Sequence, residues 1–252
     1  MKMQTVRILN IIVFLITLIA NFLANYLPMN NITTAQVSDQ FNVYFVPANY
    51  VFAIWGVIYL GLFAFIIYQS LLNQQNNERL NRIGWWFSIG SIANAIWLIL
   101  FHYGYHQLTL AAMLVLFISL LVIYQRVEIG KKPIKDIERW AVDLPFSIYL
   151  GWISVATIAN VTQTLDFIKW NGFGITPEIW TVIVLLVAVG ISWRMSVTRK
   201  DIAYNLVLVW AFIGISQKQI ATPLVANGAL AAAVLVLVGL VLGVLRKKKT
   251  SI

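Results

Sequence analysis

The chain has 252 residues, of which 60% are hydrophobic and only 11% are charged. Soluble globular domains contain about 45–50% apolar and about 25% charged residues. A soluble fold of this composition would lack the polar side chains needed to cover its surface. The composition therefore excludes a soluble globular protein and predicts a protein embedded in lipid. The net charge of +9 is interpreted as topological charge, not as a nucleic-acid-binding surface. The absence of cysteine excludes a disulfide framework and a thiolate metal site.

Long unbroken apolar runs distinguish helices from barrel strands in this sequence. A transmembrane barrel would show segments of about 10 residues that alternate between apolar and polar positions. The runs at 11–27 and 228–245 have no such alternation. Runs of about 20 residues match the roughly 30 Å thickness of the hydrocarbon core. We therefore expect an all-α fold, a polytopic membrane helix bundle.

About eight transmembrane helices are predicted along the chain. The first is expected to be retained, because its apolar run is too long for a signal peptide and no small-residue cleavage pattern follows it. The seventh is the shortest. The expected ranges are Ile8–Leu27, Tyr50–Leu72, Ile83–Tyr103, Leu108–Tyr124, Trp140–Val161, Pro177–Met195, Ile202–Ser216 and Pro223–Leu245.

Basic residues give the orientation of this layout, since Lys and Arg near helix ends prefer the cytoplasmic side. With the N-terminus inside, eight helices place every Lys and Arg in a cytoplasmic segment except Lys169 and Lys218. Removing one helix would move every later segment to the other side and destroy this separation. The charge pattern therefore predicts an even number of crossings, with the N- and C-termini cytoplasmic.

The segment at 28–46 is the longest predicted loop on the non-cytoplasmic side. It is polar, and Asp39 is its only charged residue. Loops of this length between closely connected helices are often lids or binding loops. Two interpretations stay open, a functional lid and a passive polar connector.

Few ionisable side chains lie inside the predicted helices. Asp143 is about one turn into the fifth helix, and an interfacial carboxylate stabilised by the helix dipole and water is favoured over a proton-relay or ligand carboxylate. His102 and His106 are four residues apart, but the third helix is expected to end between them and no further ligands cluster nearby. We expect no metal site, no resident cofactor and no catalytic residues, because the sequence holds no catalytic motif of known spacing.

Aromatic residues are the remaining feature, with 10 tryptophans and 10 tyrosines. Interfacial belts explain those near helix ends, whereas Trp55, Trp97, Trp152 and Trp210 lie deeper. Flat rings inside a bundle can line a pocket for a flat apolar ligand, and packing against helices or lipid is the alternative. Asparagines within the helices are interpreted as interhelical hydrogen-bonding groups. The small-residue motif GLVLG at 239–243 fits close packing within the bundle or in a dimer.

Three motifs occur in order on the second, third and fifth predicted helices. The segment PANYVFAIWGVIY at 47–59 has a proline, a W-G pair eight residues later and a tyrosine three after the glycine. The third helix carries NAIW at 94–97, followed by Phe101, and the fifth carries YLGWISVATIAN at 149–160. Together these motifs resemble those of the tryptophan-rich sensory protein / translocator protein family.

The chain departs from the family pattern at two places. Ile148 stands where the family has a proline directly before the tyrosine, and Pro145 is the nearest proline. The tryptophans that the family carries in its first loop are absent, and Tyr44, Phe45 and Tyr50 are the nearest aromatic residues. The second departure bears on ligand preference, because that loop caps the pocket of the family.

The resemblance implies a five-helix membrane domain at about 1–161, with three additional helices in 162–252 packed on it. It also implies a pocket, capped by the 28–46 loop, for a porphyrin or another lipophilic aromatic ligand, with a sensory or transport role. The residues that it places at this pocket are Pro47, Tyr50, Trp55, Tyr59, Asn94, Trp97, Phe101, Tyr149, Trp152 and Asn160.

Two other functions stay open. A small-solute secondary transporter, proton-coupled through Asp143, fits the helix count, although no inverted repeat or broken helix pair is visible. A membrane enzyme that degrades a porphyrin rests on family analogy alone. The expected location is a bacterial plasma membrane, and the expected partners are the lipid bilayer and the lipophilic ligand, with a second copy of the chain as an open alternative.

Overall fold

The computed structural model describes residues 3–26 and 29–246, and all regular secondary structure in these residues is helical. The all-α prediction is therefore confirmed. Residues 27 and 28, the predicted end of the first helix and start of the first loop, lie outside the described part. The long helices are α1 (Met3–Asn25), α3 (Ile54–Ser70), α5 (Trp86–His102), α6 (His106–Arg126), α8 (Leu144–Phe167), α9 (Pro177–Arg199), α10 (Ile202–Lys218) and α11 (Pro223–Leu245).

Six helical segments of the described chain are long and apolar enough to cross a membrane. α5 and α10 are apolar but have only 17 residues each, about 25 Å at 1.5 Å per residue. The chain is a multi-pass membrane protein, while eight crossings and cytoplasmic termini stay predictions. The six segments are Gln4–Asn25, Asn49–Ser70, His106–Arg126, Asp136–Phe167, Pro177–Arg199 and Pro223–Leu245.

The outer faces of the long helices carry exposed apolar side chains, such as Leu60 and Phe63 on α3 and Leu186 on α9. Exposed apolar surface of this extent is rare on soluble monomers. Lipid is the solvent that these faces require.

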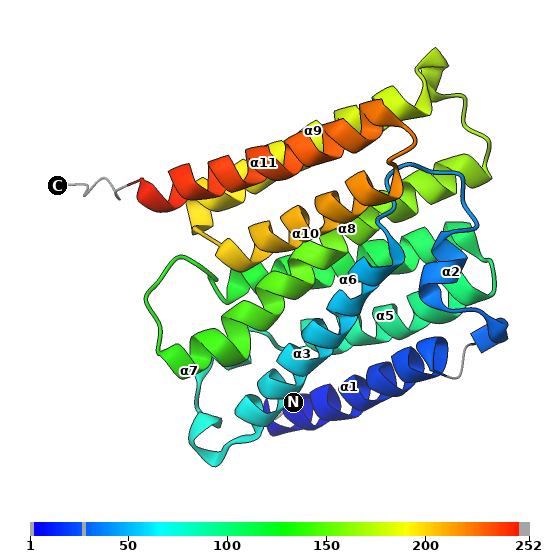
Figure 1. Ribbon diagram of the computed structural model, residues 1–252. Coiled ribbons are helices and arrows are strands. Elements are labelled where there is room, and N and C mark those ends of the chain that lie inside the picture. Colours follow the sequence, from blue (N-terminus) through cyan, green and yellow to red (C-terminus); the bar gives the residue numbers. More distant parts are fainter. Residues whose placement is uncertain (1–2, 27–28, 247–252) are drawn as a thin grey trace.

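Most of the long helices lie side by side along similar directions, and α3 runs at a steeper angle to α1 (Figure 1). α5 packs between α1 and α6, and α6 packs on α8. α10 packs on the other side of α8, and α9 and α11 pack on each other and on α10. The last three helices therefore extend the bundle from its α8 side, and α10 is the one that touches the preceding helices most.

Short helical turns complete the chain. They are η1 (Met29–Asn31), α2 (Thr34–Ser38), η2 (Asn49–Ala53), η3 (Leu72–Gln74), α4 (Glu78–Asn81), α7 (Asp136–Glu138), η4 (Arg139–Asp143) and η5 (Gly172–Gly174). In α2, the hydroxyl of Thr33 accepts from the amide of Gln36, whose side chain returns to the amide of Thr33, and this capping box fixes the short helix.

The fifth predicted helix differs most from the structure. It was expected over Trp140–Val161, yet helical backbone runs from Asp136 to Phe167 with a π-helical turn at Arg139–Asp143. The amide of Leu144 bonds to the carbonyl of Arg139, five residues earlier. Pro145 follows directly and has no N–H to donate, so the wider turn relieves the clash that a proline ring makes with the preceding turn.

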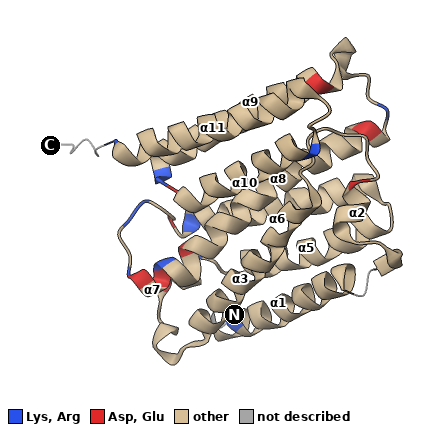
Figure 2. Ribbon diagram, in the orientation of Figure 1, with Lys and Arg blue, Asp and Glu red and all other residues tan. Residues whose placement is uncertain are grey.

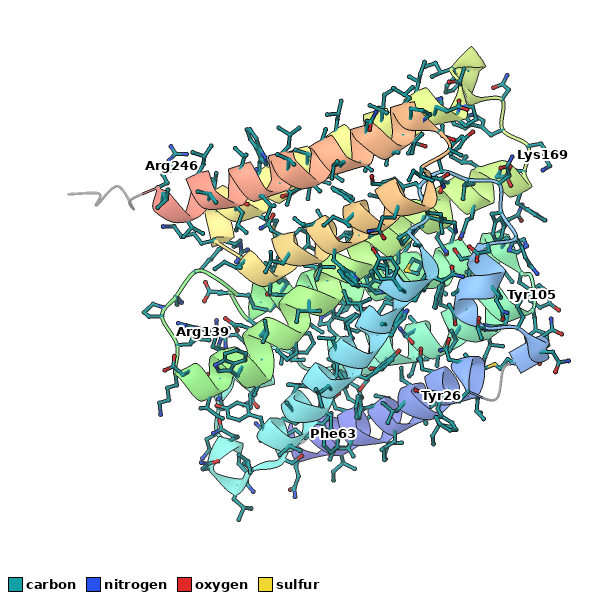
Figure 3. The ribbon with its side chains drawn as sticks, in the orientation of Figure 1. Tyr26, Phe63, Tyr105, Arg139, Lys169 and Arg246 are labelled. Carbon is teal, nitrogen blue, oxygen red and sulfur yellow. The ribbon has the colours of Figure 1, made fainter. Side chains whose placement is uncertain are left out.

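Lys and Arg gather at the end of the bundle where α1 begins and α11 ends, which we call the basic end (Figure 2). Arg139 and Arg246 lie there, and Lys169 lies at the opposite end (Figure 3). Lys218, in the last turn of α10, also lies away from the basic end. The separation matches the one predicted from the sequence, and we call the opposite end the cap end.

Candidate functional site

Trp55 on α3 is the centre of an aromatic cluster between α3, α5 and α8. Its ring stacks on that of Tyr59, with centroids 5.6 Å apart. The indoles of Trp97 on α5 and Trp152 on α8 each lie 6.2 Å from it, and the ring of Tyr149 lies 6.0 Å away. Tilted and edge-on aromatic pairs of this kind stabilise a core beyond area burial. All three tryptophans are buried.

A cavity of about 30 Å³ lies beside this cluster. Its walls come from α3, α5 and α8 and from residues 34–53, which we call the cap. Space of this size holds roughly one or two water molecules, so a flat aromatic ligand fits only if the walls separate. The lining residues are Ser38, Val46, Pro47, Phe52, Trp55, Trp97, Phe101, Trp152, Val155, Ala156, Ala159, Asn160 and Gln163.

The structure brings most of the predicted site residues to this place. Those that line the cavity are Pro47, Trp55, Trp97, Phe101, Trp152 and Asn160. Tyr59, Asn94 and Tyr149 lie behind Trp55 instead, where they are joined by hydrogen bonds. The predicted residues therefore form two groups, one that lines the cavity and one that supports Trp55 from behind.

Asn94 is the centre of this supporting network and is fully buried. Its amide nitrogen donates to the hydroxyl of Tyr149 at 2.8 Å. Its amide oxygen accepts from Asn21 at 3.1 Å and from the hydroxyl of Tyr59 at 3.4 Å. Buried amides are costly unless their groups are paired, and here one amide ties together α1, α3, α5 and α8.

A second chain of hydrogen bonds runs along the cap side of the cavity. The indole N–H of Trp97 donates to Asn160 at 3.2 Å, Asn160 donates to Gln163 at 3.2 Å, and Gln163 donates to the hydroxyl of Ser38 at 3.0 Å. The indole N–H of Trp152 is buried and has no hydrogen-bond acceptor among the described residues. The cavity is thus mostly apolar, with a few amide groups along one edge.

Tyr50 does not reach the cavity. It lies in η2, a 3-10 turn, and its ring packs edge-on against Trp210 of α10, with centroids 5.1 Å apart. Tyr50 and Trp210 are both more than a third exposed. The prediction required the side chain of Tyr50 to face inward from the cap. Its neighbour is instead Trp210 of α10, a helix that the motifs did not include. Trp210 lies in the middle of α10, away from the helix ends as predicted, but its ring is partly exposed and does not line the cavity.

Several lining residues escaped the sequence analysis. Phe52 meets Trp152 edge-on at 5.7 Å between centroids. Ala156, Ala159 and Gln163 follow Trp152 on the same face of α8. Their spacing of three and four residues is the helical signal that could have identified them, whereas nothing in the sequence marks Phe52 as inward-facing.

The two histidines lie at the end of α5 and the start of α6. The Nδ1 atom of His102 bonds to the carbonyl of Leu98 at 2.8 Å, and the ring of His106 packs against Phe41 and Phe167. The described residues contain no group of three or more potential His, Cys, Asp or Glu ligands. Both rings act as packing groups near the cap end.

Asp143 lies near the basic end and is ion-paired. Arg79 of α4 contacts the carboxylate of Asp143 and lies 3.2 Å from that of Glu138, and its Nε donates to the carbonyl of Val127 at 2.9 Å. One guanidinium therefore holds two partly buried carboxylates together. This arrangement fits the interfacial interpretation of Asp143.

Asp201 is a second buried carboxylate that the sequence analysis did not single out. It caps the N-terminus of α10 by accepting from the amide of Tyr204 at 3.0 Å. It also accepts from the hydroxyls of Tyr124 at 2.7 Å and Ser147 at 2.6 Å. An aspartate directly before an apolar run is an N-cap signal, but its bonds to α6 and α8 depend on the tertiary fold.

One family comparison covers nearly the whole chain. The family described as TSPO-like protein matches residues 7–242, from α1 into α11. No curated protein and no solved structure matches the chain. The matched range runs beyond residue 161, where the motif resemblance ends, and the division at that residue stays a prediction. Since the match spans all the long helices, the chain belongs to the TSPO-like protein family and is a membrane protein of that family.

Proposed function

We propose that this protein binds a flat, lipophilic aromatic molecule, such as a porphyrin, against Trp55, Trp97 and Trp152. The observation that carries the proposal is that three buried tryptophans from three helices meet at one cavity, which the cap also lines. Rings at the centre of a bundle offer faces and edges to a planar ligand. A cap that moves gives such a ligand a way in.

The size of the cavity restricts how binding can happen. Pockets that enclose drug-sized ligands are about 300–1,000 Å³, far above the volume present here. Val46, Pro47 and Phe52 belong to the cap, so outward movement of this segment would enlarge the space without separating α3, α5 and α8. Binding is therefore coupled to displacement of the cap.

A protoporphyrin titration in lipid nanodiscs tests the proposal, with empty nanodiscs as the partition control. Saturable quenching of tryptophan fluorescence and a shifted porphyrin absorption band are expected. Trp55→Phe and Trp152→Phe should each raise Kd about two- to tenfold, because each removes part of one stacked surface. Trp85→Phe, at the basic end of α5, is the matched control and should leave Kd unchanged. Quenching that is linear in protoporphyrin concentration and is the same in the parent and all three variants would refute binding.

A transport role is the second candidate. Proton coupling through Asp143 has weaker support than ligand binding, because Asp143 is paired with Arg79 and lies away from the cavity. If Asp143 does relay protons, Asp143→Asn should abolish pH-dependent uptake by proteoliposomes. Uptake that is unchanged in Asp143→Asn would remove proton coupling through Asp143 and leave ligand binding as it stands.

The location and partners follow from the same proposal. Segregated charge at the basic end supports insertion with that end in the cytoplasm, as in a bacterial plasma membrane. The motif at Gly239 and Gly243 packs on α9 of the same chain, so a second copy of the chain, if one binds, would use another face. Cysteine-accessibility labelling at residue 3 and residue 246 tests the orientation.

A further inference from the structure

The cap is fastened to α10 and α9 at several points. The amide of Ala48 donates to the carbonyl of Gly214 at 3.1 Å. The indole N–H of Trp210 donates to the carbonyl of Val51 at 3.2 Å. Both bonds join the inner part of the cap, next to Pro47 and Phe52, to the middle and last turns of α10. The part of the cap that walls the cavity is therefore held from the side of α10.

A second group of contacts fastens the outer part of the cap. Lys218, at the end of α10, is ion-paired with Asp39. The side chain of Gln219 donates to the carbonyl of Tyr44 at 3.3 Å, and the hydroxyl of Tyr44 donates to Glu178 of α9 at 2.8 Å. The bond to Glu178 raises the pKa of Tyr44, so the phenol stays protonated and keeps donating at neutral pH.

Gly214 permits this close approach. A Cβ atom at this position would collide with the side chain of Val51 and lie 3.1 Å from Cβ of Pro47. Val51 is fully buried, and the ring of Phe45, also fully buried, meets Phe212 edge-on at 6.5 Å between centroids. α10 is therefore shaped to receive the cap, because a larger residue at position 214 would push Pro47 and Val51 away.

We propose that α10 is a clamp that holds the cap over the aromatic cavity, and that release of the cap from α10 controls access to the cavity. The contacts of Gly214 and Trp210 with the inner cap form the core of the clamp, and the Lys218–Asp39 pair is its exposed end. The proposal rests on the proposed function for the identity of the ligand. The clamp itself is tested without any ligand.

Thiol labelling measures access to the cavity directly, because the chain has no cysteine of its own. Ala159→Cys places one thiol in the cavity wall on α8. The rate of its modification by a small water-soluble methanethiosulfonate is measured in this background. Gly214→Ala should raise the rate about tenfold or more, because the added methyl group displaces Val51 and Pro47.

Matched variants distinguish release of the cap from a general loss of helix packing. Gly190→Ala, on α9, adds the same methyl group where no atom lies within 4 Å, and it should leave the labelling rate unchanged. Val51→Ala combined with Gly214→Ala removes the colliding methyl groups and should restore most of the protection. Equal labelling in Gly214→Ala and its parent would overturn the clamp, and so would faster labelling in Gly190→Ala.

The ion pair gives a weaker, salt-sensitive effect. Lys218→Gln should raise the labelling rate about two- to fivefold, as expected for loss of a partly exposed pair, and high salt should do the same to the parent. Lys169→Gln is the control. If labelling responds as predicted but protoporphyrin does not bind, the proposed ligand is wrong and the clamp stands. If protoporphyrin binds but Gly214→Ala leaves the labelling rate unchanged, the clamp is wrong and the proposed function stands.

Discussion

The amide of Asn94 on α5 donates a hydrogen bond of 2.8 Å to the phenolic oxygen of Tyr149 on α8. The ring of Tyr149 in turn lies edge-on to Trp55, with centroids 6.0 Å apart. Neither Asn94 nor Tyr149 lines the cavity. The bond therefore positions the central tryptophan from behind, and its loss should affect stability before it affects the shape of the wall.

Tyr149→Phe should lower the free energy of unfolding by about 1 kcal/mol, because the amide of Asn94 loses a buried partner. Thermal unfolding in detergent, followed by tryptophan fluorescence, measures the change. Asn25→Ala is the control, since the side chain of Asn25 is exposed and bonds only to a carbonyl of its own helix. Equal losses in the two variants would show that the network has no special role.

Arg79→Gln should destabilise the protein by about 3–5 kcal/mol, because it leaves Asp143 and Glu138 as unpaired, partly buried carboxylates. Arg82→Gln breaks an exposed pair with Glu128 and should cost no more than about 1 kcal/mol. Chemical unfolding of the two variants in the same detergent makes the comparison. Similar midpoints for the two variants would contradict the central position given to Arg79.

Gly243→Ala should destabilise the packing of α9 on α11 by about 1–3 kcal/mol. A Cβ atom there would collide with the backbone of Ser196, which cannot rotate away. Gly56→Ala adds the same methyl group where no atom lies within 4 Å, so it should be neutral or slightly stabilising. Thermal unfolding of the two variants measures the difference. If only Gly56→Ala lost stability, the conclusion that Gly243 is closely packed and Gly56 is not would be wrong.

The arrangement of long helices followed from the sequence because membrane helices are encoded locally. An apolar run of sufficient length and a terminal proline define α11, whose predicted and observed bounds are both Pro223–Leu245. The π-helical turn before Pro145 was not predictable in the same way. It depends on how the turn around a proline relaxes against its neighbours.

The site was predictable where its residues belong to the three motifs that resemble the family. Trp55 on α3, Trp97 on α5, and Trp152 and Asn160 on α8 meet at the cavity. The resemblance implied a cap, but the conformation of the cap was not predictable, because it depends on contacts with α10 that are distant in sequence. Tyr50 is the example, since its orientation is set by Trp210.

The most direct test of the central claim is to fill the cavity without removing any tryptophan. Ala156→Phe places a large side chain in the cavity wall, whereas Ala111→Phe places the same side chain on the exposed face of α6. Protoporphyrin titrations in nanodiscs should show saturable binding to the parent and to Ala111→Phe, with at least about a tenfold weaker Kd for Ala156→Phe. The same Kd for all three proteins would contradict the account, because the ligand would then bind somewhere other than the cavity at Trp55, Trp97 and Trp152.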